Sequence, residues 1–225
     1  LRPGLSAKPA WSGVAKAIDL AKAERLTSQP DTQFRYSDIN FILLGEIVGL
    51  ASGQPLDQFA AEHIFGPLGM RDTGYQPPLA KRNRIAPTER VDGNILHGVV
   101  HDPTARRMGG IAGHAGLFTT AADLSRFARM MLNGGELNGR RLFKRRTVRL
   151  MTSVHTPKGM QAKRGLGWDI DSPYSSPRGN HFEFGGYGHT GWTGGSLWVD
   201  PSTRTTVILM TSRTHPDGKG NVIAL

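Results

Sequence analysis

The order of local patterns along this 225-residue chain predicts an α+β fold. Through the first two thirds of the sequence, apolar residues recur at the three- and four-residue spacing of helices. In the last third the pattern changes to a two-residue alternation rich in β-branched residues. We therefore expect one domain, with a mainly helical and loop-rich lobe over residues 1–150 and antiparallel strands of a central sheet over residues 151–225.

Residues that can cap a helix mark where the helices of the first lobe begin. A serine or threonine precedes each of three runs with apolar residues at helical spacing, at Ser12, at Ser37 and at Thr119-Thr120. Together with two shorter runs, the sequence predicts helices over residues 14–26, 38–50, 56–64, 121–132 and 144–151. Residues 71–116 are rich in proline and glycine, so we expect them to form loops.

Three strands are predicted in the last third, over residues 166–170, 195–199 and 205–211. Residues 200–204 have the composition of a turn, because aspartate, proline and serine follow one another there. The second and third strands should therefore form an antiparallel pair.

Composition excludes several classes of protein. Lys and Arg number 28 against 18 Asp and Glu, a formal net charge of +10. The basic clusters lack interleaved aromatic residues or a binding motif, so we expect solvated surface and no nucleic-acid partner.

The chain has no cysteine, which excludes disulfides and thiolate metal sites. The longest apolar run, residues 39–50, is interrupted by Asn40 and Glu46 and is shorter than the roughly 18 residues of a membrane span, so none is predicted.

A glycine-rich segment from Gly188 to Pro201 is the strongest local sign of a functional site. It runs as a turn into an alternating apolar strand, with His189 at the junction. Such a density of glycine at a strand start indicates close backbone contact or a bulge. The backbone N–H of Trp192 is then a candidate donor to a reacting carbonyl oxygen. The alternative is that His189 is a structural histidine with satisfied hydrogen bonds.

Tyr36 is the second candidate, because it ends an extended segment just before a predicted helix. Ser37 and Asp38 place short polar side chains beside it. In the simpler interpretation, Tyr36 packs against its neighbours while Ser37 and Asp38 cap the helix. A phenol titrates near about 10, so Tyr36 can act as a base at neutral pH only beside a strong positive charge.

The remaining histidines carry weaker signals. His97 and His101 are four residues apart, but the glycine and valines between them do not favour a helix, and no acidic ligand follows in a metal-binding pattern. We therefore expect no metal and no cofactor. Asp102 and His114 lie in glycine-flanked loops, where they could line a cleft or simply end the loops.

Tyr36-Ser37-Asp38 and His189-Thr190-Gly191, in this order and at this separation, resemble the second and third motifs of the serine β-lactamase and penicillin-binding-protein superfamily. The similarity is greatest to its class C-like branch, which includes DD-peptidases and carboxylesterases. Residues 34–49, 113–124 and 188–201 extend the resemblance over nearly the whole chain. It implies a β-lactamase/DD-peptidase-like fold, in which helices flank an antiparallel sheet.

The resemblance assigns a role to each candidate. Tyr36 corresponds to the tyrosine that shuttles a proton to and from the nucleophile. Asp38 occupies the place where many members have an asparagine that contacts the substrate amide. His189 stands where β-lactamases have a lysine, so the permanent cation that binds a β-lactam carboxylate is missing. These two differences favour esters or D-amino-acid peptides over β-lactams as substrates.

The same resemblance places Thr190 and Gly191 against the substrate and makes the Trp192 N–H half of an oxyanion hole. Members of the superfamily also carry Ser-x-x-Lys, whose serine attacks the substrate. No serine in these 225 residues has a lysine three positions later, and Gly-x-Ser-x-Gly is absent as well. We therefore expect a fragment of a larger hydrolase, without the N-terminal strands, the nucleophile helix and most of a C-terminal helix that begins near Gly220.

Three functions remain open from the sequence. The first is a serine hydrolase that cleaves an ester or amide of a small-molecule or peptidoglycan-type acyl substrate, with the complete protein periplasmic or secreted and this chain alone inactive. The second is a non-catalytic module that binds an acyl peptide or the cell wall and has lost the nucleophile. A nucleic-acid-binding protein is a distant third. In any of these, exposed strand edges could lead the chain to self-associate.

Overall fold

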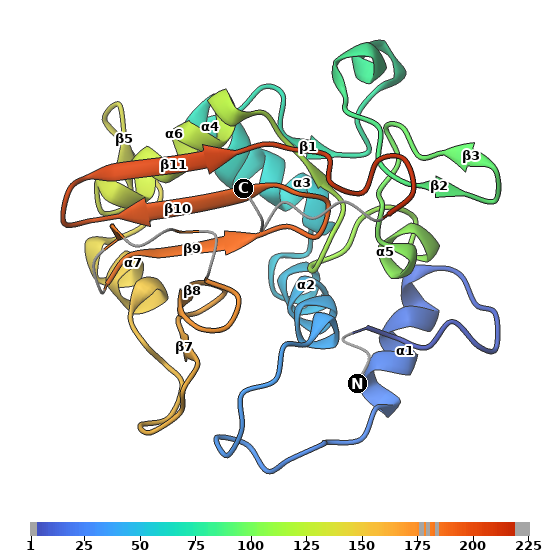
Figure 1. Cartoon of the computed structure of the whole chain (residues 1–225), viewed down its shortest axis with the longest axis horizontal. Helices are drawn as coiled ribbons and strands as arrows, with labels where there is room; N and C mark the ends of the chain where they lie inside the picture. Colours follow the sequence, from blue (N-terminus) through green and yellow to red (C-terminus); the bar gives the residue numbers. More distant parts are fainter. Residues whose placement is uncertain (1–3, 176–177, 179–180, 183–184, 219–225) are drawn as a thin grey trace.

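The structure is a computed structural model that describes residues 4–175, 178, 181–182 and 185–218. Its centre is a five-stranded antiparallel sheet in the order β11-β10-β9-β8-β7 (Figure 1). The strands are β7 (Lys163–Arg164), β8 (Asp169–Asp171), β9 (Tyr187–Thr190), β10 (Ser196–Asp200) and β11 (Thr205–Leu209). Helices and antiparallel strands in this arrangement confirm the α+β class.

The predicted hairpin at the end of the sheet is confirmed. Strands β10 and β11 pair antiparallel, from Ser196 opposite Leu209 to Asp200 opposite Thr205. The buried Asp200 carboxylate holds the turn, since it accepts hydrogen bonds from the Ser202 N–H at 2.8 Å and from the Thr203 hydroxyl at 2.8 Å. An acceptor at the first residue of a turn satisfies backbone donors that would otherwise face solvent.

His189 lies within a strand, which corrects the expectation that it marks a turn before the strand. It belongs to β9, and the glycines after it form the turn between β9 and β10, with the Gly191 N–H donating to the Gly195 carbonyl at 2.6 Å. The predicted close contact is confirmed at Gly188. A Cβ there would lie 2.3 Å from the Leu197 oxygen and 2.3 Å from the nearest atom of the Trp198 ring. Only glycine fits, because the ring covers the backbone directly.

The described part of the chain contains eight helical segments, not counting one 3₁₀ segment at Leu79–Arg84. The α-helices are α1 (Val14–Ala23), α2 (Asp38–Ser52), α3 (Leu56–Ala60), α4 (Gly66–Leu68), α5 (Pro103–Arg107), α6 (Ala121–Leu132) and α7 (Arg145–Thr152). A π-helical turn at Ala61–Phe65 joins α3 to α4, so the helix expected over residues 56–64 consists of α3 and this π-helical turn.

Two of the three predicted helix caps are confirmed. The Ser37 hydroxyl accepts a hydrogen bond from the Asn40 N–H, and the Thr120 hydroxyl accepts one from the Asp123 N–H. The first cap is wrong by one residue, because Gly13 precedes α1 and offers no side chain. Helix α1 also ends at Ala23, before the residue range predicted from its apolar spacing ends.

The loop-rich prediction for residues 71–116 was partly wrong, because the segment contains short pairs and one helix. Strand β1 (Gly74–Tyr75) pairs with β4 (Leu117–Phe118), and β2 (Arg90–Val91) pairs with β3 (Asn94–Ile95). A further pair, β5 (Glu136–Leu137) with β6 (Arg140–Arg141), follows α6. Two-residue strands are too short for a period of two to show, so the sequence pattern missed them.

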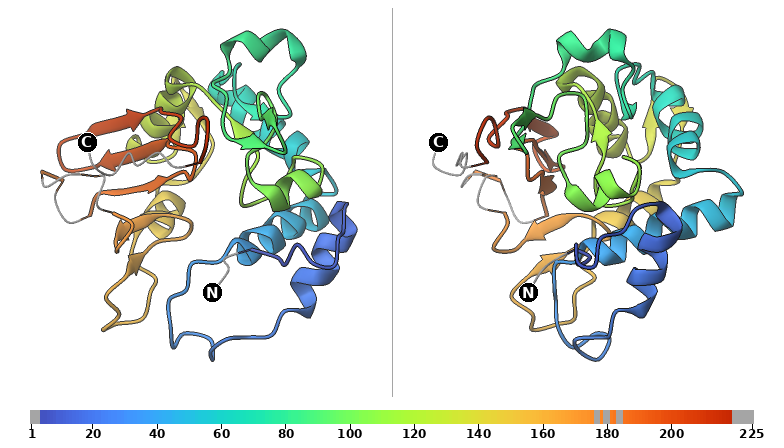
Figure 2. Two further views of the ribbon diagram at one scale, coloured as in Figure 1. Left: turned by 45° about the vertical axis from the view of Figure 1, so that its right-hand side comes forward. Right: turned by 90° about the vertical axis from the view of Figure 1, so that its right-hand side faces the viewer.

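Two hydrophobic clusters divide the molecule. One joins the sheet to α6 and α7, which lie on one face of it, and includes Met130, Val148 and Val199 (Figure 2). The other joins α1, α2 and α5 beside the sheet, around Ile18 and Ile42. The N-terminal end of α2 therefore faces strands β7 to β9 from the other cluster.

Within the described residues, no single helix is long and apolar enough to cross a membrane. Asp38–Ser52 joined to Leu56–Leu68 passes by length and composition only as a pair bent by 78°. The helix expected after Gly220 lies outside the described residues.

Candidate active site

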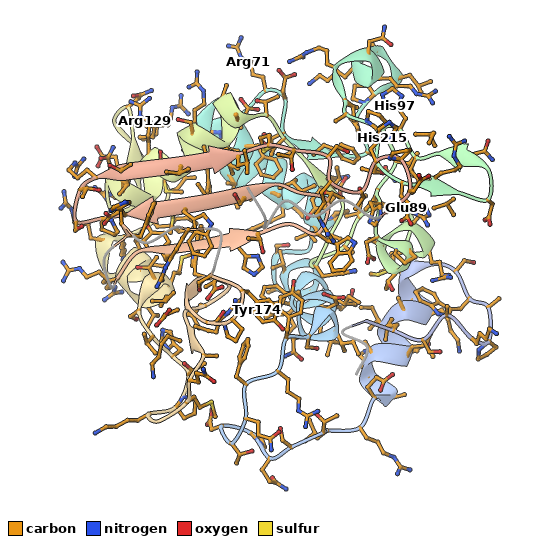
Figure 3. All side chains as sticks on the ribbon, viewed as in Figure 1. Arg71, Glu89, His97, Arg129, Tyr174 and His215 are labelled. Carbon is orange, nitrogen blue, oxygen red and sulfur yellow. The ribbon has the colours of Figure 1, made fainter. Side chains whose placement is uncertain are left out.

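The structure brings the two distant candidate motifs together. The Tyr36 ring lies just before α2, with its centroid 6.2 Å from the His189 ring on β9. Tyr174 completes this aromatic group, with its centroid 5.5 Å from that of Tyr36, and lies between α2 and β8 (Figure 3). Tyr36 is 42% exposed, so it lines an accessible surface and is not a core aromatic.

The surroundings of Tyr36 keep its proton in place. Partial burial raises the pKa of the phenol, and the negative charge of Asp38 raises it further, while the nearby Arg164 opposes both. Because the net shift is upward from 10.0, Tyr36 is a neutral phenol at physiological pH in this chain. It can donate a proton or a hydrogen bond, whereas action as a base would require an additional cation.

Both ring nitrogens of His189 have partners. Nδ1 lies 2.8 Å from the Thr190 carbonyl oxygen, and Nε2 lies 3.0 Å from Nη2 of Arg164. Burial lowers the pKa of His189, and the positive charge of Arg164 lowers it further, against the opposing effects of the Thr190 carbonyl and Asp169. The imidazole is therefore held uncharged under ordinary conditions.

Arg164 and Asp169 form a buried ion pair beside this histidine. Their closest charged atoms, Nη1 and Oδ2, are 3.4 Å apart, and the two residues are 8% and 1% exposed. The Ser172 hydroxyl donates to Asp169 Oδ2 at 2.9 Å, and the guanidinium lies 5.4 Å from the centre of the Phe34 ring. No motif in the sequence singles out Arg164. The only local signal was an arginine two residues before a predicted strand.

A second polar cluster lies at the N-terminal end of α2. His114 Nε2 lies 2.9 Å from Asp102 Oδ1, and ligand-type atoms of Asp38, Asp102 and His114 all lie within 4.8 Å of one another. These three side chains have the kinds of ligand atom that hold a cation. The His114 Nε2 atom, however, is already within hydrogen-bond distance of the Asp102 carboxylate. The sequence left Asp102 and His114 undecided between a cleft and a loop end, and the structure places both beside the candidate site.

The two carboxylates of this cluster differ in electrostatic environment. Burial raises the pKa of Asp38, with His114 opposing and Asp102 reinforcing that shift. Burial would also raise the pKa of Asp102, but hydrogen bonds from His114 and from the Ala105 N–H outweigh it and lower the pKa. Asp102 is thus the anionic partner of His114 and the N-cap of α5, since its Oδ1 accepts from Ala105 N at 2.7 Å.

Trp192 lies on the turn after β9, with 72% of the residue exposed. Its ring lies 4.3 Å from the guanidinium carbon of Arg213, and its carbonyl accepts a hydrogen bond from Arg213 Nε. Among the residues that the structure describes, the Trp192 N–H has no hydrogen-bond acceptor. The neighbouring Gly191 N–H is used within the turn, whereas the Trp192 N–H remains available as a donor to a ligand.

His97 and His101 have separate partners, and His97 lies near the β2–β3 side of the molecule (Figure 3). His97 Nε2 lies 2.8 Å from the Ile85 carbonyl oxygen, and His101 Nε2 lies 2.8 Å from Glu89 Oε2. Each histidine stabilises its own loop, and the two do not converge on a shared ligand.

A helix-flanked antiparallel sheet with a Tyr-Ser-Asp helix start facing a His-Thr-Gly strand defines a class of protein, the serine β-lactamases and penicillin-binding proteins. The family model described as Beta-lactamase matches residues 2–224. The chain belongs to the Beta-lactamase family, a family of hydrolases, which confirms the resemblance seen in the sequence.

Relatives of known name agree with this family. The chain is 35% identical over 219 residues to a protein of Escherichia coli K12 named "Putative D-alanyl-D-alanine carboxypeptidase", and the match covers 89% of this chain and 50% of that protein. It is 35% identical over 218 residues to the N-acetylmuramyl-L-alanine amidase of Bacillus subtilis strain 168, covering 89% and 49%. The chain therefore spans about half the length of the curated relatives it matches.

Solved structures agree with the fold. A penicillin-binding protein homologue from Caulobacter crescentus superposes with a TM-score of 0.66 at 18% sequence identity. The match covers 96% of this chain and 63% of that one. At this level of identity the similarity establishes the architecture and leaves substrate and reaction to be argued from the site.

Proposed function

We propose that this chain forms the substrate-binding and proton-transfer side of a serine hydrolase that works through an acyl-enzyme. The observation that carries the proposal is the contact between the Tyr36 and His189 rings, which joins two motifs from opposite parts of the chain. A substrate carbonyl beside Tyr36 would have the Trp192 N–H as a donor for its developing oxyanion. Thr190 and Gly191 line the same strand end and would align the substrate along β9.

In this mechanism a serine oxygen attacks the carbonyl carbon, and the bond to the leaving nitrogen or oxygen breaks. The neutral Tyr36 phenol donates its proton to that leaving atom and becomes a phenolate, which a cation must stabilise. The lysine of Ser-x-x-Lys supplies that cation in the superfamily. The proton that the serine hydroxyl loses then passes to the Tyr36 oxygen, so Tyr36 ends the acylation step as a phenol again. Water subsequently attacks the acyl-enzyme and releases the acid.

The nucleophile is proposed to lie in a part of the whole protein outside these residues. No serine here has a lysine three positions later, and the relatives are about twice as long as the match. We therefore expect the 225-residue chain alone to be inactive towards esters and amides.

For the substrate we propose a peptidoglycan-type peptide or a related ester, in preference to a β-lactam. The relatives named for D-alanyl-D-alanine cleavage and for muramyl-alanine cleavage both act, by those names, on cell-wall amides. Asp38 replaces the asparagine that many members offer to a substrate amide, and an ionised carboxylate accepts but does not donate a hydrogen bond. Asp38 would therefore suit a substrate N–H better than a substrate carbonyl.

The experiment compares this chain with the whole natural protein. Both are incubated with a reactive penicillin and with a fluorophosphonate, and intact masses are recorded. We expect an adduct on the whole protein, mapped to the serine of a Ser-x-x-Lys motif, and none on the 225-residue chain. A D-Ala-D-Ala peptide and a short-chain nitrophenyl ester should be turned over in preference to a chromogenic cephalosporin.

Two outcomes would contradict the proposal. An adduct on the chain itself would place the nucleophile within these residues. Saturable binding of the D-Ala peptide by the whole protein, without adduct or turnover, would favour the alternative of a non-catalytic cell-wall binding module.

A further inference from the structure

The hydrogen bonds of His189 determine where its proton lies. A guanidinium can only donate, so the contact between Arg164 Nη2 and His189 Nε2 at 3.0 Å makes Nε2 an acceptor. A carbonyl oxygen can only accept, so the contact between Nδ1 and the Thr190 oxygen at 2.8 Å makes Nδ1 a donor. The two contacts together permit one form of the ring, the neutral imidazole with its proton on Nδ1.

We propose that Arg164 is a positioning residue, which locks His189 as this neutral tautomer and so makes it a permanent donor to the Thr190 carbonyl. His189 then carries no proton to or from a substrate. The positive charge that a lysine places at this strand in β-lactamases lies instead on Arg164 of β7, two strands away in the same sheet.

The groups around His189 also favour the neutral form of its ring. Asp169, on β8, pairs with Arg164 through Nη1, whereas His189 contacts Nη2, and Ser172 donates to Asp169 in turn. Tyr36 faces the ring from the segment before α2, and Tyr174 faces Tyr36. Apart from Arg164 and Asp169, the ionisable groups that face the ring are the phenols of Tyr36 and Tyr174, and the Tyr36 phenol is neutral. Among the residues that the structure describes, therefore, no unpaired carboxylate lies against the ring to stabilise an imidazolium.

The consequence lies in the backbone that follows. The Thr190 carbonyl is the last group of β9 before the turn that carries the Trp192 N–H. Holding that carbonyl fixes the orientation of the next peptide and hence of the turn. This catalytic consequence rests on the proposed function, whereas the tautomer itself is a property of the chain and can be measured without any activity.

The test is a nuclear magnetic resonance titration of the ¹⁵N-histidine-labelled chain between pH 5 and 8. The chain has eight histidines, so an His189→Gln variant assigns the resonances of His189. We expect an Nδ1-protonated ring with an unprotonated Nε2, and no titration of this ring near the ordinary value of about 6.5. An Nε2-protonated ring, or a midpoint at or above 6.5 in the wild-type chain, would overturn the proposal.

Two variants separate positioning from general stability. Arg164→Met removes the donor and the charge, so the His189 midpoint should rise and the second tautomer should appear. Arg164→Lys keeps a cationic donor and should retain the Nδ1-protonated form. An unchanged tautomer and midpoint in Arg164→Met would refute the role of Arg164. If that variant does not fold, the wild-type and Arg164→Lys spectra still decide the matter.

A negative result here would leave the proposed function standing, because acylation of the whole protein is measured separately. Conversely, a locked tautomer in a protein that is never acylated would leave the positioning role intact and refute the hydrolase.

Discussion

Ionisable side chains that lie close together in the site are held in different charge states. Tyr36 is held as a neutral phenol by burial and by the Asp38 charge, and His189 is held as a neutral ring by burial and by Arg164. Asp102, in contrast, is held as an anion by hydrogen bonds from His114 and the Ala105 N–H, which overcome its burial. Each residue therefore has a distinct expected response to substitution.

Replacing Tyr36 with phenylalanine in the whole protein should reduce turnover by about 10²–10⁴-fold, the usual contribution of general acid–base help. The protein should remain folded, because Tyr36 is 42% exposed and its hydroxyl has no hydrogen-bond partner among the described residues. Steady-state kinetics with the ester and the D-Ala peptide provide the measurement. Tyr174→Phe is the matched control, since Tyr174 is a neighbouring and similarly exposed tyrosine whose removal should have a small effect. Equal losses in the two variants would contradict the assignment.

Replacing Asp102 with asparagine should lower the free energy of unfolding by about 1–2 kcal/mol through the lost anionic partner of His114, because asparagine caps a helix about as well as aspartate does. The folded-state pKa of Asp102 lies below 3.8, so its carboxylate contributes fully above that pH and less as the pH falls through the lowered value. The difference from wild type in urea unfolding should accordingly shrink under acid conditions.

Asp102→Ala separates the two contributions of this carboxylate. Alanine is a poor N-cap and supplies no charge to His114, whereas asparagine loses only the charge. A loss of stability larger than that of the asparagine variant would assign the difference to the cap, and an equal loss would assign the whole effect to His114.

At the scale of elements, close backbone contact shapes the β9–β10 hairpin. Gly188 lies opposite Trp198, whose ring covers the space that a side chain would need. At the other end of the same hairpin, a Cβ on Gly195 would have no atom nearer than 3.8 Å. The two glycines thus differ in their tolerance of a side chain although both belong to the glycine-rich motif.

Gly188→Ala should destabilise the chain by about 1–3 kcal/mol or more, because its Cβ would overlap the Leu197 oxygen and the Trp198 ring. Gly195→Ala should change stability by only a few tenths of a kcal/mol, since it meets ordinary van der Waals contacts. Thermal or urea unfolding of the two variants, side by side, gives the comparison. Similar stabilities would mean that the hairpin relaxes easily around Gly188.

At the scale of the whole molecule, the site lies where the two hydrophobic clusters meet. Tyr36 and Asp38 come from the side of α2, whereas His189 and Arg164 come from the sheet. On the opposite edge of that sheet, no described strand pairs with the outer side of β11. Val207 and Leu209 on this strand are 46% and 44% exposed. An open apolar edge of this kind can pair with another chain.

We therefore predict that the chain self-associates through β11. Val207→Lys should weaken the association by about tenfold, roughly 1.4 kcal/mol, because a charge on an edge strand opposes pairing. Sedimentation velocity over a range of concentrations measures it. Leu79→Lys is the control, since Leu79 is 84% exposed but lies on the 3₁₀ segment away from the sheet. A monomer at all concentrations, or equal effects of the two substitutions, would contradict edge pairing.

The sequence by itself determined what depends on neighbours along the chain. The caps at Ser37 and Thr120, the β10–β11 hairpin and the family follow from short motifs and apolar periodicity, and the structure or the family match confirmed them. Periodicity reports which residues face a core, because burial repeats with the geometry of the helix or strand.

Tertiary structure decided the site's electrostatics. The contact of Arg164 with His189, and the approach of Asp38 to Asp102 and His114, join residues far apart in sequence. Strand register and the docking of α2 against the sheet determine those distances, and neither leaves a local pattern in the chain. The sequence could therefore name Tyr36 and His189 as candidates, but only the folded chain shows which of their atoms are free to act on a proton.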